Sequence, residues 1–418
     1  MRTLDIFEHR ESQVRSYCRK WPIVFDRAGG AWLYDETGRP YLDFFSGAGA
    51  LNYGHNNPVL KEALLEYLTR DGVIHSLDMY TAAKRDFLAA FGELILQPRD
   101  LDYRIQFPGP GGANAVEAAL KLARKVTGRT DVITFTNAFH GMTLGALSVT
   151  GSPFHRGGAG VPLTHTTPMP FDDGQAGPAP DFLWLERLLA SRGSGPDKPA
   201  AAIVETVQGE GGIRVARPEW LRTLAGLCQR HGIVLIVDDV QMGCGRTGPF
   251  FSFETAGLRP DIVCLSKSIG GYGLPLALTL IRPDLDIWEP GEHNGTFRGV
   301  NPAFVTGAAA LRTYWRDDAL QRGTLAKGRR AAAALDALAQ SVPGTPIEPR
   351  GRGLARCLAF EDGELAGKVS AAAFERGLLV ETAGPRGEAV KLLPPLTITD
   401  AELGQGLERL ADAVRSVC

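Results

Sequence analysis

The stretch Ile233-Val-Leu-Ile-Val-Asp-Asp-Val-Gln241 is a run of apolar β-forming residues that ends abruptly in two carboxylates. A second apolar run, Ile262-Val-Cys-Leu265, ends in Ser266-Lys267-Ser268. The spacing leaves room for one crossover between two neighbouring parallel strands. Asp238 and Lys267 would then project from adjacent strand ends, which is where open α/β sheets bind their ligands.

An acid and a lysine at neighbouring strand ends suit pyridoxal phosphate. The lysine can form an imine with the aldehyde of this cofactor, and the aspartate can pair with its pyridinium nitrogen. Two ordinary buried strands with solvent-facing ends would show the same pattern. The pair therefore predicts a cofactor site only together with further motifs.

The composition narrows the classes of protein to consider. At 418 residues the chain predicts two domains, and its 44% apolar and 22% charged residues are typical of a globular protein. A net charge of −2 gives no electrostatic case for binding nucleic acid or an anionic membrane. The N-terminus lacks the apolar stretch of a signal peptide, and no apolar run is long enough to span a membrane. Six scattered cysteines and eight dispersed histidines predict a cytoplasmic protein with reduced thiols and no metal site.

Strands and helices alternate from about residue 103, which is the mark of a parallel sheet. The small domain is expected to combine residues 1–70, with a β-hairpin at 31–45, and residues 305–418. The large α/β domain is expected over residues 71–304. A long Pro/Gly-rich connection over 152–200, including 174–180, predicts a functional or mobile loop. The strand candidates are Tyr103–Phe107, Val132–Thr136, Ala202–Glu205, Val234–Val237, Ile262–Leu265 and Leu276–Ile281, and the helix candidates include 58–70, 81–96, 113–125, 218–231, 303–315, 320–340 and a final helix from 399.

Four glycine-containing motifs follow or flank these strands. Phe107-Pro-Gly-Pro-Gly-Gly-Ala-Asn114 opens a helix, whose N-terminal amides would favour a phosphate. In Thr136-Asn-Ala-Phe-His-Gly-Met-Thr143, Phe139 could stack on a pyridine ring, or Phe139 and His140 could simply belong to the core. The third motif, Glu205-Thr-Val-Gln-Gly-Glu-Gly-Gly212, indicates either the edge of a binding site or a capped turn. The fourth motif, Asn294-Gly-Thr-Phe-Arg-Gly299, indicates either a phosphate contact or an exposed loop. Their convergence on strand ends of one sheet favours the functional alternatives.

The chain resembles the class III (ω-)aminotransferases of the fold-type I pyridoxal-phosphate enzymes, from about residue 20 to the C-terminus. The class-specific residues are Asp238, Gln241, Gly245-Arg-Thr-Gly248 and Ser266-Lys267. More narrowly, it is similar to the diaminobutyrate–2-oxoglutarate aminotransferases in Leu51–Pro58, Leu77–Arg85, Val204–Gly212, Gly270–Pro275 and Asn294–Gly299. The resemblance implies a mostly parallel seven-stranded sheet in the large domain and a smaller α+β domain.

The resemblance also implies a role for each matching residue. Lys267 would be the Schiff-base lysine and proton shuttle, and Asp238 would pair with the pyridine nitrogen. Phe139 would stack on the ring. The remaining expected cofactor contacts are Gly111, Gly112, Ala113, His140, Glu205, Gln241 near the phenolic oxygen, and Thr296, which would reach the phosphate of the other subunit. Active sites would thus lie at the interface of a homodimer, with a dimer of dimers as a further option.

Three positions depart from the usual pattern of the class. Gly111 stands where Ser or Thr is usual, so one hydroxyl contact to phosphate is missing, and Asp239 stands where Glu is usual. Lys391 stands where many members place an arginine for the substrate carboxylate, although the diaminobutyrate group carries lysine there too. Glu210 would be its gating partner, paired with Lys391 until an α-carboxylate displaces it.

The implied reaction exchanges the terminal amine of L-2,4-diaminobutyrate, giving aspartate 4-semialdehyde, with the 2-oxoglutarate/glutamate couple. Such a reaction would feed ectoine or other secondary-metabolite synthesis. Ornithine, acetylornithine, 4-aminobutyrate or lysine are alternative substrates on the same fold. An aminomutase, a decarboxylase or a catalytically silent paralogue are further alternatives, although intact Asp238, Gln241 and Lys267 argue against the last.

Overall fold

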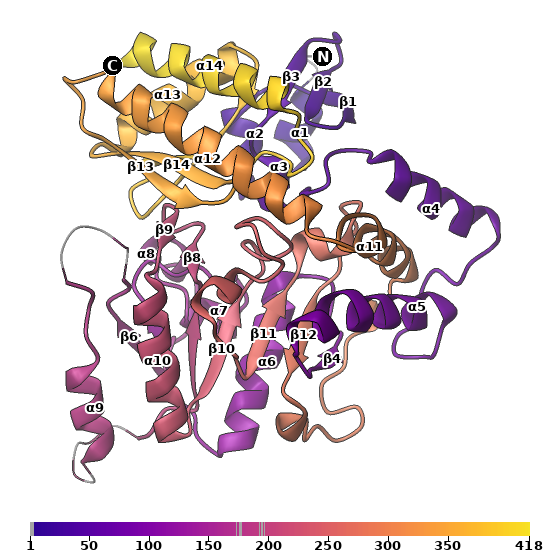
Figure 1. Ribbon diagram of the computed structural model, residues 1–418, viewed down its shortest axis with the longest axis vertical. Helices are drawn as coiled ribbons and strands as arrows, with labels where there is room; N and C mark the ends of the chain where they lie inside the picture. Colours follow the sequence, from indigo (N-terminus) through magenta and orange to yellow (C-terminus); the bar gives the residue numbers. More distant parts are fainter. Residues whose placement is uncertain (1–3, 173, 175–177, 192, 194, 196) are drawn as a thin grey trace.

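A seven-stranded sheet forms the centre of the larger part of the molecule (Figure 1). The computed structural model describes residues 4–172, 174, 178–191, 193, 195 and 197–418. Only β12 runs antiparallel to its neighbours, so the predicted mostly parallel α/β fold is confirmed. In spatial order the strands are β4 (Arg104–Gln106), β12 (Leu278–Ile281), β11 (Ile262–Leu265), β10 (Val234–Asp238), β7 (Ala201–Val204), β5 (Val132–Phe135) and β6 (Thr166–Met169).

The central strands are apolar because both faces of the sheet are covered by helices. Along β10, Val234 and Ile236 pack in one core cluster, while Leu235 and Val237 pack in another. This alternation is expected when successive side chains point to opposite faces. The first cluster includes α6 (Gly112–Thr127), and the second includes α5 (Ala82–Phe91), α10 (Pro218–His231) and α11 (Asn301–Tyr314).

The edge strand β6 is not among the strands predicted from the sequence. It lies within the segment 152–200, which was expected to be a long connection and in fact also contains α8 (Pro153–Arg156) and α9 (Leu183–Ala190). The strand is short and contains Pro168, and proline is tolerated in a sheet mainly at its edge. Such a strand has no clear apolar pattern. Residues 175–177 of the same predicted connection lie outside the described residues.

The smaller part of the molecule contains both chain ends (Figure 1). The predicted hairpin is present, and β15 pairs parallel with β3 through Leu378 and Leu42, which joins the two terminal segments in one sheet. The domain boundaries at 70/71 and 304/305 stay a prediction. The strands of this part are β1 (Phe25–Gly29), β2 (Trp32–Asp35), β3 (Pro40–Asp43), β13 (Ile347–Arg352), β14 (Ala355–Phe360), β15 (Leu378–Leu379), β16 (Glu381–Ala383) and β17 (Ala389–Leu392), and its long helices are α12 (Ala319–Gln340), α13 (Gly363–Glu375) and α14 (Asp400–Val417).

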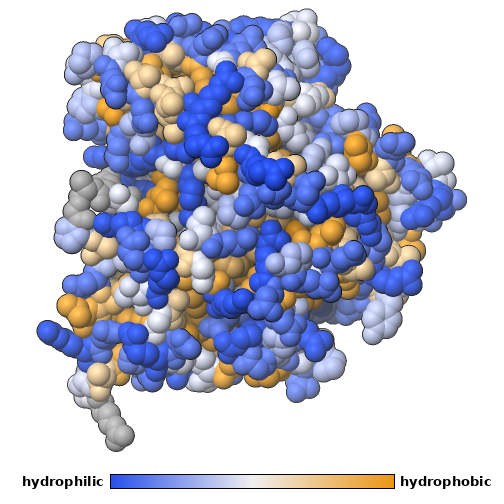
Figure 2. Space-filling model, viewed as in Figure 1, coloured by the Kyte–Doolittle hydropathy of each residue, from blue (hydrophilic) through white to orange (hydrophobic). Residues whose placement is uncertain are grey.

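The remaining α-helices and β-strands range from the two-residue strands β8 and β9 to the twelve-residue helix α4. They are α1 (Asp5–Arg10), α2 (Tyr17–Lys20), α3 (Ser46–Gly49), α4 (Pro58–Thr69), α7 (Leu144–Ser148), and the ribbon of β8 (Val207–Gln208) with β9 (Arg214–Val215). The face drawn in Figure 2 is mainly polar, with separate apolar patches. Within the described ranges, no helix combines the length and the hydropathy needed to cross a bilayer.

Candidate active site

The C-terminal ends of four neighbouring strands converge on one cavity of about 180 Å³. The loops after β5, β7, β10 and β11 reach it together with the first turn of α6, as expected for a ligand site in an open α/β sheet. All the site residues predicted from the sequence line this cavity except Gly111, Thr296 and Lys391. The lining residues are Gly112, Ala113, Phe139, His140, Gly141, Glu205, Glu210, Asp238, Val240, Gln241 and Lys267.

Lys267 stands at a strained turn two residues after the end of β11. Its φ of 54° lies in the left-handed region, which is costly for a residue with a Cβ and is common at functional sites. Nζ of Lys267 donates a hydrogen bond to the carbonyl of Ala48 at 2.9 Å. Burial lowers the pKa of Lys267, and the nearby Glu210 carboxylate opposes this effect only in part. The amine is therefore easier to deprotonate than an ordinary lysine.

Asp238 ends β10 and is held in place by two hydrogen bonds. Its Oδ2 lies 2.7 Å from Nδ1 of His140, and its Oδ1 accepts a hydrogen bond from the amide of Val240 at 3.1 Å. In the parallel ladder Asp238 lies beside Cys264, three residues before Lys267. The predicted placement of the acid and the lysine on adjacent strands is thus confirmed. Burial works to lower the pKa of His140, but the hydrogen bond and the charge of Asp238 raise it overall.

Glu205 fixes the loop that carries Phe139. Its Oε2 accepts a hydrogen bond from the amide of Phe139 at 3.1 Å, and its Oε1 accepts one from Gly209 at 3.2 Å. Burial raises the pKa of Glu205 to about 7, with the charge of His140 opposing the rise. Glu205 therefore orients the aromatic ring at the cavity wall through the backbone.

The N-terminus of α6 opens onto the cavity. The side chain of Asn114 accepts a hydrogen bond from the amide of Gly111 at 3.0 Å, while the next amides belong to the first turn, where a helix offers them no internal acceptor. A Cβ on Gly112 would lie 2.8 Å from Cγ1 of Val240, so a larger residue would not fit here without a shift. The amides of Gly112 and Ala113 could therefore hold an anion, to which Gly111 would add no hydroxyl contact.

Two buried polar atoms among the lining residues lack a hydrogen-bond partner in the described part of the chain. They are Nε2 of His140 and Oε1 of Gln241. Unpaired buried polar atoms are costly, and they are expected where a ligand completes the site. With the lysine, the acid, the aromatic ring and the amides at the start of α6, they fit the group predicted from the sequence. No set of His, Cys, Asp and Glu side chains in the described residues could hold a metal ion.

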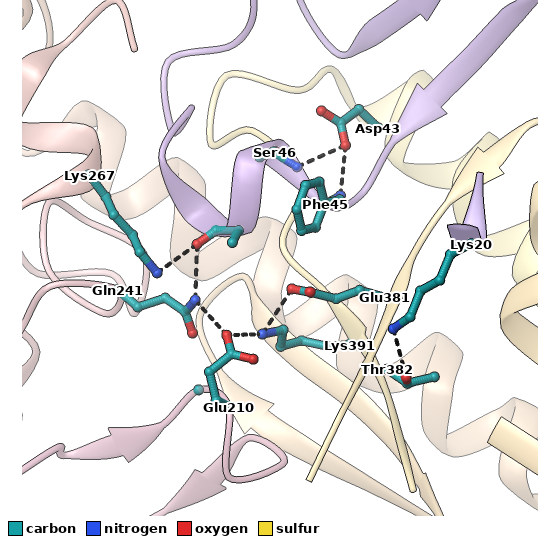
Figure 3. Close-up of polar contacts among 12 residues, drawn as sticks. Lys20, Asp43, Phe45, Ser46, Glu210, Gln241, Lys267, Glu381, Thr382 and Lys391 are labelled. Atoms are coloured by element: carbon teal, nitrogen blue, oxygen red, sulfur yellow. Dashed lines mark hydrogen bonds and ion pairs between the residues drawn. The ribbon is translucent and has the colours of Figure 1, made fainter. Parts of the chain in front are cut away.

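Lys391 lies between two carboxylates (Figure 3), of which Glu210 lines the cavity. Its Nζ is 2.6 Å from Oε1 of Glu210 and 2.9 Å from Oε1 of Glu381. The side chains of Lys391 and Glu381 are 0% and 3% exposed, whereas that of Glu210 is 30% exposed. Burial would raise the pKa of Glu210, but the charges of Lys391 and Lys267 lower it to about 2. Glu210 is therefore a charged and accessible partner of a buried cation.

A continuous polar chain links this cluster to Lys267 (Figure 3). Nε2 of Gln241 donates to the carbonyl of Ala48 at 2.9 Å, the same oxygen that accepts from Lys267. The same nitrogen donates to Oε1 of Glu210 at 3.1 Å. The lysine and the Glu210–Lys391 pair thus belong to one connected site, although Lys391 itself does not line the cavity.

One carboxylate of the site was not predicted from the sequence, and the predicted contact of Thr296 with the other subunit stays a prediction. Glu381 is absent from the predicted residues, and its only signal is a carboxylate directly after the apolar run Leu378-Leu-Val380. Thr296 does not reach the cavity of its own chain but is exposed on the surface. Its carbonyl accepts a hydrogen bond from Nε2 of His75 at 2.6 Å.

The sequence pattern of the family "Aminotransferase class-III" matches residues 15–414. The chain belongs to this family. A diaminobutyrate–2-oxoglutarate transaminase of Streptomyces avermitilis is 65% identical over 99% of the chain and 98% of its own length. A protein of the same name from Vibrio parahaemolyticus is 52% identical, covering 99% of the chain and 98% of its own length.

Solved structures of other aminotransferases share the whole fold of this class III member. The lysine aminotransferase of M. tuberculosis superimposes with a TM-score of 0.86 at 26% identity, covering 100% of the chain and 99% of its own. The ornithine aminotransferase of Toxoplasma gondii gives a TM-score of 0.85 at 26% identity, covering 99% and 94%. The predicted fold-type I architecture is thus confirmed over the full chain.

Proposed function

We propose that this protein is a pyridoxal-phosphate-dependent aminotransferase that exchanges the terminal amine of L-2,4-diaminobutyrate with the 2-oxoglutarate/glutamate couple. One observation carries the cofactor assignment: Asp238 and Lys267 project from adjacent parallel strands into the cavity that also receives the N-terminus of α6. The substrate assignment is supported by full-length relatives named diaminobutyrate–2-oxoglutarate transaminase at 52 to 65% identity. The other diamino and ω-amino substrates have no comparable support.

Different residues of the cavity would bind different groups of the cofactor. The amides of Gly112 and Ala113 would hold the phosphate, and Phe139 would lie against the ring. Asp238, kept in position by His140, would face the ring nitrogen and favour its protonated form, because opposite charges attract. When bound, pyridoxal phosphate supplies an electron sink that makes the C–H bond beside the reacting amine acidic. Gln241, with its unpaired Oε1, would lie near the phenolic oxygen.

Lys267 would move the proton. Its lowered pKa favours a neutral amine, which can take a proton from the carbon that carries the reacting amine and return it elsewhere. The carbonyl of Ala48 keeps Nζ directed toward the cavity when the amine is free. The left-handed turn at Lys267 fixes the base of the side chain, so the amine acts from a defined position.

Glu210 and Lys391 would let one site accept two kinds of substrate. With glutamate or 2-oxoglutarate, the α-carboxylate would take the place of Glu210 on Lys391. With diaminobutyrate, whose reacting carbon carries no carboxylate, Glu210 would stay paired. The exposure of Glu210 and the burial of Lys391 support this division, because only the accessible partner can leave.

The active unit would be a homodimer. Exposed apolar side chains gather where residues 73–80 lie against residues 296–300, as shown by the hydrogen bond between the amide of Ser76 and the carbonyl of Gly299. The patch consists of Val73, Ile74, Leu77, Met79, Tyr80 and Phe297. Thr296 lies beside Phe297, so a second copy seated on this patch would bring Thr296 to the neighbouring cofactor phosphate. Free cysteines throughout the described chain are compatible with a cytoplasmic enzyme.

A donor screen tests the proposal. The purified enzyme with pyridoxal phosphate is mixed with diaminobutyrate, ornithine, acetylornithine, lysine or 4-aminobutyrate, and the absorbance change from aldehyde to amine cofactor is followed. We expect the largest kcat/KM for diaminobutyrate with 2-oxoglutarate as acceptor. Preference for another donor would overturn the substrate assignment, and sustained turnover without any acceptor would overturn the transaminase assignment.

A further inference from the structure

The cluster around Lys391 contains two carboxyl groups and one ammonium group. Glu381 and Lys391 are directly opposite each other in the β16–β17 ladder, so this ion pair is held by the sheet itself. Glu210 adds a second carboxylate to the same ammonium. One buried lysine thus pairs with two acids. Burial raises the pKa of Glu381, with the charge of Lys391 opposing the rise, so a further cationic group nearby would stabilise the charged form of this carboxylate.

A positive charge lies near these two acids. Nζ of Lys20 donates a hydrogen bond to Oγ1 of Thr382, the residue that follows Glu381 (Figure 3). Lys20 belongs to the short helix α2, which is anchored because the ring of Tyr17 packs at 4.8 Å from the ring of Phe45. Although Thr382 and Glu381 are consecutive in β16 and point to opposite faces, the acid and the base lie close enough to interact: burial lowers the pKa of Lys20, and the charge of Glu381 opposes this effect. This charge pattern is complementary to the ammonium and carboxylate of an α-amino acid.

We propose that Glu381 and Lys20 form the subsite for the non-reacting end of a diamino acid, with Glu381 facing its α-ammonium group and Lys20 facing its α-carboxylate. The inference rests on the proposed function, since it names what holds the far end of diaminobutyrate while the terminal amine reacts. Glu381 is accordingly a specificity residue and not part of the proton transfer. A donor without the α-ammonium group leaves the charge of Glu381 without this partner.

Three amino donors distinguish the contact of Glu381 with the α-ammonium group from the contact of Lys20 with the α-carboxylate. 4-Aminobutyrate is diaminobutyrate without the α-amino group, and 1,3-diaminopropane is diaminobutyrate without the carboxylate. In the Glu381→Gln enzyme, we expect kcat/KM to fall about 10- to 100-fold for diaminobutyrate and 1,3-diaminopropane, the range for loss of a hydrogen bond to a charged group, and to be unchanged for 4-aminobutyrate. In the Lys20→Gln enzyme, we expect the fall for diaminobutyrate and 4-aminobutyrate, and none for 1,3-diaminopropane.

Matched variants exclude a merely structural effect. Glu388 is a buried carboxylate between β16 and β17 that pairs with Arg214 at 3.6 Å outside the cavity. Glu388→Gln should therefore leave the ranking of the three donors unchanged, and Glu381→Asp should restore part of the preference for diaminobutyrate. The cofactor absorbance should stay the same in all these variants, because none of them contacts the cavity that holds it.

The outcomes distinguish failure of the proposed function from failure of this inference. A wild-type enzyme that does not use diaminobutyrate refutes the proposed function, and this inference with it. A wild-type enzyme that uses diaminobutyrate, together with a Glu381→Gln enzyme that keeps the wild-type ratio of diaminobutyrate to 4-aminobutyrate, refutes the inference alone. An equal loss with all three donors also refutes it, because it indicates damage to the common site.

Discussion

Replacing Glu210 by Gln should change the two half-reactions in opposite directions. The variant keeps the size of the side chain but loses the charge that pairs with Lys391 at 2.6 Å. Lys391 retains Glu381 as a partner at 2.9 Å, so the buried cation is not left alone and the fold should persist. The α-carboxylate of glutamate or 2-oxoglutarate would then reach Lys391 without displacing a competitor.

The size of this effect follows from the pKa of Glu210. Its fall from 4.5 to about 2 corresponds to about 3 kcal/mol in favour of the charged carboxylate. Because the side chain is 30% exposed, solvent screening reduces the usable part to about 1–2 kcal/mol, or a roughly 5- to 30-fold lower KM for 2-oxoglutarate. The KM for diaminobutyrate should rise, since Lys391 then repels this donor, whose net charge is positive, more strongly.

Single-turnover absorbance measurements with each substrate separate the two effects. The amine form of the cofactor is mixed with 2-oxoglutarate in one series, and the aldehyde form with diaminobutyrate in the other. Glu254→Gln serves as a control, because Glu254 also pairs with a basic side chain, Arg99 at 2.9 Å, but lies outside the cavity. An unchanged KM for 2-oxoglutarate in Glu210→Gln, or an equal change in both half-reactions, would show that Glu210 is not a gate.

Three further perturbations have defined outcomes. Lys267→Ala should lower turnover at least about a thousandfold while diaminobutyrate still binds, because the proton shuttle is lost, and full turnover would refute the assignment. Thr296→Ala should weaken cofactor binding. If Thr296 acts across the interface, a mixed dimer of one Thr296→Ala subunit and one Lys267→Ala subunit should regain one intact site. Mixed dimers without activity would contradict this. Burial raises the pKa of Asp239 to about 7, so the folded protein holds a proton there that the unfolded chain has released, and stability should fall as the pH rises from about 4 to about 7. Asp239→Asn should reduce that fall in pH-dependent melting curves, and an unchanged pH profile would argue against it.

The central part of the site could be predicted because local sequence determines it. Each of Asp238 and Lys267 follows its own apolar strand, and the short crossover leaves few arrangements other than adjacent parallel strands. The glycine-rich opening of α6 is likewise a local signal. These residues lie where the strand ends meet, so their convergence follows from the fold class alone.

Other parts of the site depend on contacts between segments far apart in the sequence. Glu381 becomes a site residue only through its register with Lys391, which no local pattern specifies. The carbonyl of Ala48 and the amine of Lys20 come from the opposite end of the chain, and a backbone oxygen leaves no mark on residue choice. The edge strand β6 was not predicted for a different reason: it is short and contains Pro168, so its sequence lacks the pattern of a strand.

The most direct test of the account is chemical trapping of the lysine that carries the cofactor. The enzyme with pyridoxal phosphate is reduced with sodium borohydride, digested, and the modified peptide is identified by mass spectrometry. The account predicts that the label lies on Lys267, with Lys391 and Lys20 unmodified, and that Lys267→Met abolishes the labelling. A label on Lys391, or an equally strong label in the Lys267→Met enzyme, would contradict it.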